Sequence, residues 1–182
     1  MNNLNVKGSI KKAIIILVIF LLFITLLKSF QSVPTGYVGI KTRFGKVSDD
    51  VIQEGLNFKI PYIEKIVLMD CRTQKSEVDS STASKDLQEV SLNVAVNYNV
   101  NRDTSYELYR QVGINYESII ISPAVLESVK SVTAQYTAEE LITKRSEVSD
   151  KMQETLKEKI ENRGFAVIDF NITDLDFSAA YN

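Results

Sequence analysis

The strongest hydrophobic pattern in the chain is an uninterrupted apolar run near its N-terminus. Residues Ala13–Leu27 (AIIILVIFLLFITLL) include one hydroxyl group and no charge, and lysines flank the run on both sides. As a helix this run is about 22 Å long, which is short for a hydrocarbon core of roughly 30 Å. Counting from Ile10 to Phe30 gives about 31 Å, provided that Lys11, Lys12 and Lys28 extend their ammonium groups into the headgroups. We therefore predict a transmembrane anchor over residues 13–27, with outer limits at 10 and 30, behind a short basic N-terminus over residues 1–12.

A cleaved signal peptide is the alternative interpretation of this run, because signal peptides also combine a basic start with a short apolar stretch. Cleavage requires small residues at positions −3 and −1, and no two small residues stand two apart between Thr25 and Tyr37. This favours an uncleaved anchor, whereas cleavage would release a secreted domain. A buried core helix fits less well, since the run is apolar on every face.

The next part of the chain has the periodicity of strands. The clearest alternation is in Leu87–Val100, where every second residue from Val90 onward is large and apolar, which predicts an antiparallel strand with one buried face. A single cysteine, Cys71, lies in a strand-like segment and is expected to be a small core residue. The other predicted segments are strands over Tyr37–Phe44, Leu56–Ile60, Glu64–Cys71 and Arg72–Val78, a turn at Gly45, and a polar loop over Ser80–Asp86.

After residue 100 the period changes to that of helices. The predicted helices are Thr104–Val112, a segment from Asn115 to about Gln135 (with Ile119, Val125, Val129 and Val132 along it) that Pro123 should kink or divide, and 138–162 behind a capping box at Thr137–Glu140. The apolar stripe of the helix over 138–162 is Leu141, Val148, Met152, Leu156 and Ile160, and Gly164 is placed to end this helix. A strand over Val167–Phe177 follows, with Ile168, Phe170 and Ile172 on one face. This order predicts an α+β fold: a curved antiparallel sheet packed by helices in one compact domain, with the last strand beside one that precedes the helices.

Charge is unevenly distributed along the chain. The formal net charge is −2, yet no acid precedes Asp49, and the first 48 residues hold seven cations. The remaining residues carry 14 basic and 23 acidic groups, a net charge of −9. Such a domain repels phosphate backbones, which argues against nucleic-acid binding, while the early cations suit anionic lipid headgroups. The chain has no histidine, which removes the usual nucleophile–base pairs and the commonest metal ligand. We therefore predict no catalytic, cofactor or metal site, and no enzyme.

Several short motifs occur in an order and spacing that resemble the SPFH (band 7) domain family, and within it the prohibitin branch. They are VPTGYVGI at 33–40, FGKV at 44–47, EGLNFKIP at 54–61, DCRTQK at 70–75, SKDLQ at 84–88, VAVNY at 94–98, TAQYTAEELI at 133–142 and DFNITDLDFS at 169–178. The resemblance covers about residues 33–182. It implies an SPFH domain in a single-span membrane protein that assembles into rings or cages, organises membrane proteins or lipids, and restrains membrane AAA proteases of the FtsH type.

The resemblance also assigns roles to individual residues. Pro34 and Gly36 would turn the chain off the membrane, and Gly39, Gly45, Gly55 and Pro61 would set tight turns. Phe44, Phe58 and Ile60 would lie in the core or touch the bilayer surface. Family members continue past the last strand into a coiled-coil helix, a region that is absent from this chain. Either the chain is a truncated form, or the full ring is not available to it.

Two functional hypotheses follow. The first is a prohibitin-like scaffold that self-associates, as a homo- or hetero-oligomer, through its SPFH domain. The second is a membrane-tethered binding module that acts as a small oligomer on one specific partner without forming a cage. The charged outer face of the helix over 138–162 is either solvated or a subunit interface. The numbers of lysine and arginine residues on the two sides of the predicted span are nearly equal, so the positive-inside rule does not set its orientation. The charge count therefore leaves the orientation open, and the resemblance favours a domain outside the cytoplasm or matrix, at a bacterial plasma membrane or mitochondrial inner membrane, with a cytosol-facing domain as the alternative.

Overall fold

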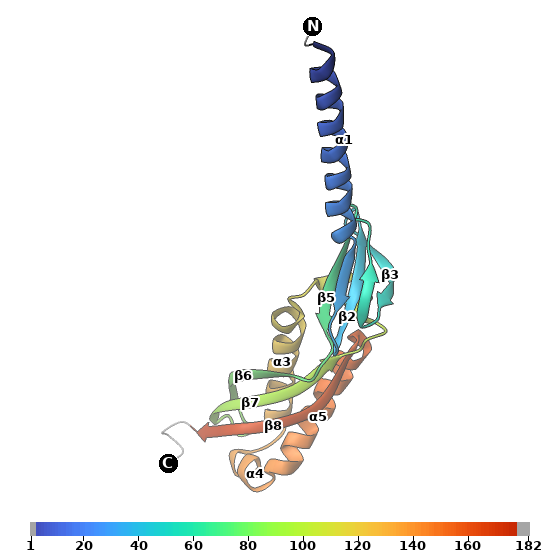
Figure 1. The fold of residues 1–182 in the computed structure, drawn as a ribbon. Helices are drawn as coiled ribbons and strands as arrows, with labels where there is room; N and C mark the ends of the chain where they lie inside the picture. The colour runs from blue at the N-terminus through green and yellow to red at the C-terminus, as the bar shows by residue number, and fades with distance from the viewer. Residues whose placement is uncertain (1–2, 178–182) are drawn as a thin grey trace. The chain divides into compact units, whose positions relative to one another are not determined.

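The computed structural model describes residues 3–177 (Figure 1). The chain divides into two compact units, Met1–Leu68 and Met69–Asn182. The α+β class with antiparallel sheets packed by helices is confirmed, but the expectation of one compact domain is wrong. The physical reason is that the described strands form three separate sheets, so no single sheet gathers them around one core. Residues 1–2 of the predicted basic N-terminus and 178–182 of the predicted SPFH domain lie outside the described residues.

The first unit joins one long helix to two small sheets. Helix α1 (Asn3–Leu27) precedes β1 (Phe30–Val33), β2 (Tyr37–Arg43), β3 (Lys46–Ile52), β4 (Gly55–Phe58) and β5 (Glu64–Asp70). Strand β1 pairs antiparallel with β4, and the second sheet has the order β3-β2-β5. The helix ends at Leu27, so the predicted outer limit of the span at Phe30 is wrong, because Phe30 pairs with Phe58 in the β1–β4 ladder.

The second unit is built on a three-stranded sheet of order β6-β7-β8. Strands β6 (Gln74–Ala83) and β8 (Phe165–Phe177) flank β7 (Glu89–Val100), whose alternating residues from Val90 to Val100 are buried as predicted. The polar loop predicted over Ser80–Asp86 is wrong in its first part. Residues Ser80 to Ala83 are the end of β6 and pair with β7. A polar residue is tolerated there because the side chain of Ser80 is small enough to lie on the buried face.

Helices cover one face of this sheet (Figure 1). The helical segments of this unit are α2 (Ser105–Val112), the π-helical turn η1 (Glu117–Ile121), α3 (Ser122–Thr133), α4 (Ala138–Thr143), α5 (Arg145–Ile160) and the 3-10 turn η2 (Glu161–Arg163). Of these, α3 packs against β6 and α5 against β8. The capping box at Thr137 and Glu140 and the buried stripe from Leu141 to Ile160 are confirmed. Pro123 stands in the first turn of α3, directly after η1, so the second predicted helix is divided; Ile119 of η1 is exposed.

The predicted long helix is broken at Lys144, whose φ of −111° and ψ of 30° are not helical. Hydrogen bonds from Lys144 N to Glu140 O and from Val148 N to Lys144 O continue across the break. The apolar stripe therefore stays in register through it. Gly164 follows η2 with a φ of 86°, the left-handed conformation typical of a helix end.

Strand β8 is an edge strand, and α5 donates hydrogen bonds to its middle part, from Ile168 to Ile172. Arg145 Nη2 donates to Ile172 O at 2.6 Å, Ser149 Oγ to Phe170 O at 2.9 Å, and Gln153 Nε2 to Ile168 O at 3.4 Å. Four residues of helix advance about 6.0 Å and two residues of strand about 6.7 Å, so each helical step matches one strand repeat. Three consecutive turns of α5 thus cover three alternate carbonyl groups of the edge strand.

Candidate membrane-facing site

Helix α1 exposes a continuous apolar surface. Its stretch Ile10–Leu27 is long and apolar enough to cross a membrane, the one such stretch among the described residues, and none of it is buried. The flanking Lys11, Lys12 and Lys28 are all exposed. Thr25 Oγ1 donates to Leu22 O at 2.8 Å, which satisfies the hydroxyl within the helix. An unburied apolar surface of this size marks a site of contact with lipid or with another protein.

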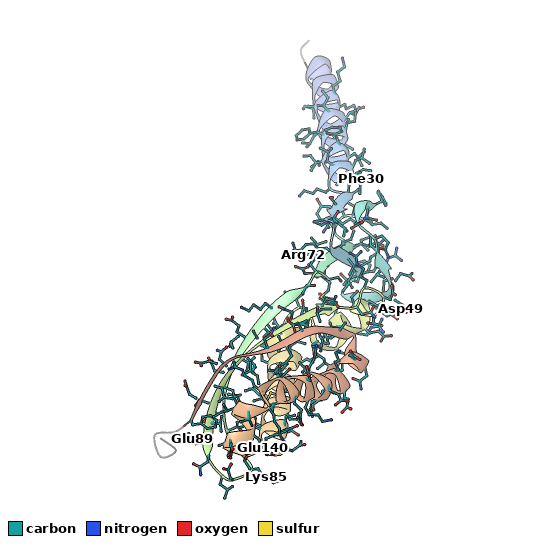
Figure 2. The ribbon with its side chains drawn as sticks, turned by 90° about the horizontal axis from the view of Figure 1, so that it is seen from below. Phe30, Asp49, Arg72, Lys85, Glu89 and Glu140 are labelled. Carbon is teal, nitrogen blue, oxygen red and sulfur yellow. The ribbon has the colours of Figure 1, made fainter. Side chains whose placement is uncertain are left out.

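The end of α1 is tied directly to the strands that follow it. Ser29 N and Ser29 Oγ donate to carbonyl groups of the last helical turn, at 3.1 and 3.0 Å. Ser29 O in turn accepts a hydrogen bond of 2.7 Å from Lys59 N, directly after β4. Phe30 and Phe58 then form an edge-to-face aromatic pair, with ring centroids 5.8 Å apart. Figure 2 labels Phe30 at this junction of helix and strand.

Two further turns lie at the same end of this unit. Between Ile60 and Glu64, Glu64 N donates to Ile60 O at 2.9 Å and Ile60 N to Glu64 Oε2 at 3.0 Å. Ile63 O accepts a hydrogen bond of 3.0 Å from Phe44 N, which connects this turn to the β2–β3 hairpin. Phe44, Phe58 and Ile60 are 81%, 57% and 36% exposed, so none of them is a core residue. Of the two predicted roles, the core role is wrong; contact with the bilayer surface stays a prediction.

Glu64 is the electrostatic centre of this end of the unit. Its carboxylate accepts from Ile60 N and lies 3.7 Å from Lys41 Nζ and 3.6 Å from Arg43 Nε. The hydrogen bond from Ile60 N, followed by the two cations, lowers the pKa of the Glu64 carboxyl despite its partial burial. Glu64 therefore stays ionised and holds the Ile60–Glu64 turn against β2.

The predicted shape residues occupy different kinds of position. Pro34 opens a turn closed by Tyr37 N donating to Pro34 O at 3.1 Å, with Gly36 at a φ of 85° as type II turns require. Gly45 in the β2–β3 hairpin and Gly55 at the start of β4 also have positive φ, and Pro61 lies in the turn before Glu64.

Gly39 is the exception, because it lies within β2 and not in a turn. A Cβ atom there would stand 2.7 Å from Ile66 Cγ2 and 3.1 Å from both Ile52 and Val33. The tight-turn role predicted for Gly39 is therefore wrong: glycine is needed for close packing between the strands. Whether Pro34 and Gly36 direct the chain away from a membrane stays a prediction.

Sequence reasoning missed part of this surface. Leu56 and Tyr62 are 73% and 78% exposed, and Tyr62 has a φ of 65°, which is unusual for an aromatic residue. Lys59 and Lys65 flank the same turn. The signal that could have found the turn is Pro61, since proline interrupts regular structure; that the neighbouring side chains lie near one another follows only from the fold.

The remaining chemistry-bearing groups are few. Cys71 is buried as predicted, and burial raises the pKa of its thiol, which makes it a poor nucleophile. Within residues 3–177, no three His, Cys, Asp or Glu side chains are grouped so that they could hold a metal ion. The outer face of α5 carries exposed pairs such as Lys151–Glu154 at 2.6 Å, which contribute little to stability.

Comparison with known proteins identifies relatives over most of the chain. Residues 31–182 match the family model described as SPFH domain / Band 7 family. Prohibitin-1 of Schizosaccharomyces pombe is 33% identical over 160 residues, which cover 87% of this chain and 57% of that protein. Prohibitin-2 of Mus musculus is 34% identical over 140 residues (76% and 47%), and the mitochondrial Prohibitin-1 of Arabidopsis thaliana is 34% identical over 154 residues (84% and 54%). The chain thus spans about half the length of these relatives.

Proposed function

Because this chain belongs to the SPFH domain / Band 7 family and to its prohibitin branch, we propose that it is a membrane-anchored scaffold. Helix α1 crosses the bilayer once. The domain behind it assembles with other copies, or with related chains, and organises membrane proteins or lipids. The role is non-enzymatic.

The observation that carries this proposal is the unburied apolar stretch Ile10–Leu27. A helix of 18 residues is about 27 Å long, close to the thickness of a hydrocarbon core. Lysines at both ends hold the helix in place by reaching the headgroups. The exposed Tyr62 near the end of α1 supports the same placement, since tyrosine is enriched at membrane interfaces.

Membrane insertion is tested by washing membranes with alkaline carbonate. We expect the full chain to remain in the membrane pellet. The double variant Val18→Asp/Leu22→Asp places two carboxylates in the middle of the span, each costing about 3 kcal/mol, and should be released. Ile142→Asp is the matched control, because Ile142 is equally exposed but lies in α4. Release of the unmodified chain would disprove the anchor.

Self-assembly is tested by measuring the mass of the complex in mild detergent. One chain has a mass of 20.5 kDa, and a scaffold requires a complex of many copies or of several related chains. A small, discrete oligomer would instead support the membrane-tethered binding module. A single copy would refute both self-assembly and the scaffold.

The protease and the orientation form the finer part of the proposal. We propose that the assembly modulates an FtsH-type membrane AAA protease, and that the domain faces away from the cytoplasm or matrix. Purification of the cross-linked complex from membranes should recover such a protease. Protease added to the cytoplasmic or matrix side should leave residues 30–177 intact; digestion from that side would reverse the orientation.

A further inference from the structure

A cavity of about 460 Å³ opens in the first unit at the C-terminal end of α1. Its lining residues are Lys28, Phe30, Lys59, Pro61, Tyr62, Glu64 and Lys65. The volume is in the range of small-molecule binding sites. Lys28 directly follows Leu27, the last residue of the apolar stretch. The cavity therefore lies where a helix that crosses the bilayer leaves the hydrocarbon and enters the headgroup layer.

The cavity is positively charged. Three lysines and one glutamate line it, which gives a formal charge of +2. The Glu64 carboxylate is already engaged by Ile60 N at 3.0 Å and by the nearby Lys41 and Arg43, which do not line the cavity. These partners compensate its negative charge from outside, so Glu64 opposes the lysines only weakly.

None of the three lysines forms an ion pair with a carboxylate among the described residues, so their side chains can contact a ligand. Lys59 Nζ donates to Gln31 Oε1 at 2.7 Å, and this amide is neutral, so it positions the ammonium group without cancelling its charge. Within the part of the chain that the structure describes, neither Lys28 nor Lys65 forms an ion pair with a carboxylate. An anion in the cavity would thus meet three cations from three segments of the chain.

Two aromatic side chains, Phe30 and Tyr62, line the cavity. Tyr62 is 78% exposed and is held at a φ of 65°, a conformation that is costly for a residue with a Cβ atom. Tyr62 lies inside the turn that the reciprocal hydrogen bonds between Ile60 and Glu64 close. Phe30 makes an edge-to-face contact with Phe58. Such rings suit the boundary between headgroups and acyl chains.

We propose that this cavity binds the phosphate-bearing headgroup of an anionic phospholipid from the adjacent leaflet. Lys28, Lys59 and Lys65 contact the phosphate, while Phe30 and Tyr62 contact the glycerol and the first acyl carbons. The proposal rests on α1 crossing the bilayer, as inferred above. A zwitterionic lipid binds less well, because its own ammonium group meets the lysines.

The test is native mass spectrometry of the full chain in detergent, titrated with phosphatidylglycerol or phosphatidylcholine. We expect tighter binding of phosphatidylglycerol. Loss of one lysine near an anionic lipid weakens binding about fivefold, so Lys59→Gln/Lys65→Gln should weaken it about twenty-five-fold. The control Lys130→Gln/Lys157→Gln removes the same charge from the second unit and should retain the affinity.

Three results would overturn the proposal: equal affinity for the two lipids, equal loss in the control variant, or displacement of the lipid by millimolar inorganic phosphate, which would identify a site for free phosphate. Circular dichroism of Lys59→Gln/Lys65→Gln checks that the fold is kept. Failure of the anchor is distinguishable, because carbonate would then release the unmodified chain whatever the lipid titration shows.

Discussion

The three hydrogen bonds from α5 to β8 lead to a quantitative prediction. Arg145 makes a charge-assisted bond of 2.6 Å to Ile172 O, and such bonds contribute about 1.5–3 kcal/mol. Because the Arg145 side chain is exposed, water replaces part of this contribution, and we expect about 1.5 kcal/mol from Arg145→Met. Methionine keeps a similar helix propensity and removes only the donors.

The other two contacts should contribute less. Ser149→Ala loses a neutral bond of 2.9 Å, about 1 kcal/mol, but gains about 0.5 kcal/mol of helix propensity, which leaves a net loss of about 0.5 kcal/mol. Gln153 is 3.4 Å from Ile168 O, at the limit of a hydrogen bond, so Gln153→Met should change the stability by less than about 0.3 kcal/mol. The expected order of destabilisation is therefore Arg145, then Ser149, then Gln153.

The chain has no tryptophan, so urea unfolding of the full chain in detergent is best followed by circular dichroism at 222 nm. Glu158→Met, on an exposed position of the same helix, is the control. Arg145 and Gln153 are about 12 Å apart along α5, so their effects should add. The triple variant should also self-associate more readily, since it uncovers an edge strand. A loss for Arg145→Met no larger than that for Gln153→Met would refute the reasoning.

Three further predictions concern packing and charge. Gly39→Ala should lower the free energy of unfolding by about 1–3 kcal/mol in the same urea assay, because the new methyl group overlaps a β-branched side chain; an unchanged midpoint would contradict this. Tyr98→Phe should be neutral or stabilising, since the buried Tyr98 hydroxyl has no hydrogen-bond partner within residues 3–177, whereas Tyr116→Phe should lose about 1 kcal/mol with its hydrogen bond to Gln74; the reverse order would be inconsistent with this packing. The Asp86 carboxylate accepts hydrogen bonds from Ser84 Oγ, which has the larger effect, and from Ala138 N, and both lower the pKa of its carboxyl group. Ionised Asp86 therefore stabilises the fold above its unfolded pKa of about 4, and this contribution is lost as the pH falls through the lower pKa of the folded state. Asp86→Asn should flatten acid unfolding below about pH 4, and an unaltered acid transition would rule out this role.

Elements with strong periodicity could be predicted from the sequence. The alternation from Val90 to Val100 succeeded because β7 is the central strand, with one face against the helices, so nearly every residue on that face had to be apolar. Strand β3 was not predicted. Its segment Lys46–Ile52 carries Ser48, Asp49 and Asp50 in its middle, and only its pairing with β2 makes it a strand.

Breaks that preserve register are invisible to periodicity. The break at Lys144 leaves Leu141 and Val148 on the same side, because the helical hydrogen bonds continue through it. In β8 the regular alternation predicted from the sequence is interrupted. A bulge lies between Val167 and Asp169, which pair with Tyr98 and Asn97 of β7, so Ile168 is an extra residue in this strand. The bulge turns Ile168 outward, 52% exposed, and puts Val167 in the core, so the predicted alternation fails for Ile168 while Phe170 and Ile172 stay buried.

The membrane-facing site was predictable only in part, for a physical reason. The apolar run predicts a membrane span, but its 15 residues are short for one, and the prediction took the rest from both ends, out to Ile10 and Phe30. Helix α1 supplies it on the N-terminal side, since it extends back to Asn3 and ends at Leu27. Because β1 begins at Phe30, the helix cannot be extended beyond Leu27 toward the C-terminal side. If α1 crosses the bilayer as proposed, this boundary places Lys28 at the headgroup layer. The pairing of β1 with β4 brings Lys59 to the same cavity from about 30 residues further along the chain. A long-range pairing of this kind leaves no periodic trace in the sequence, so the lysines could be recognised as cations but not as neighbours.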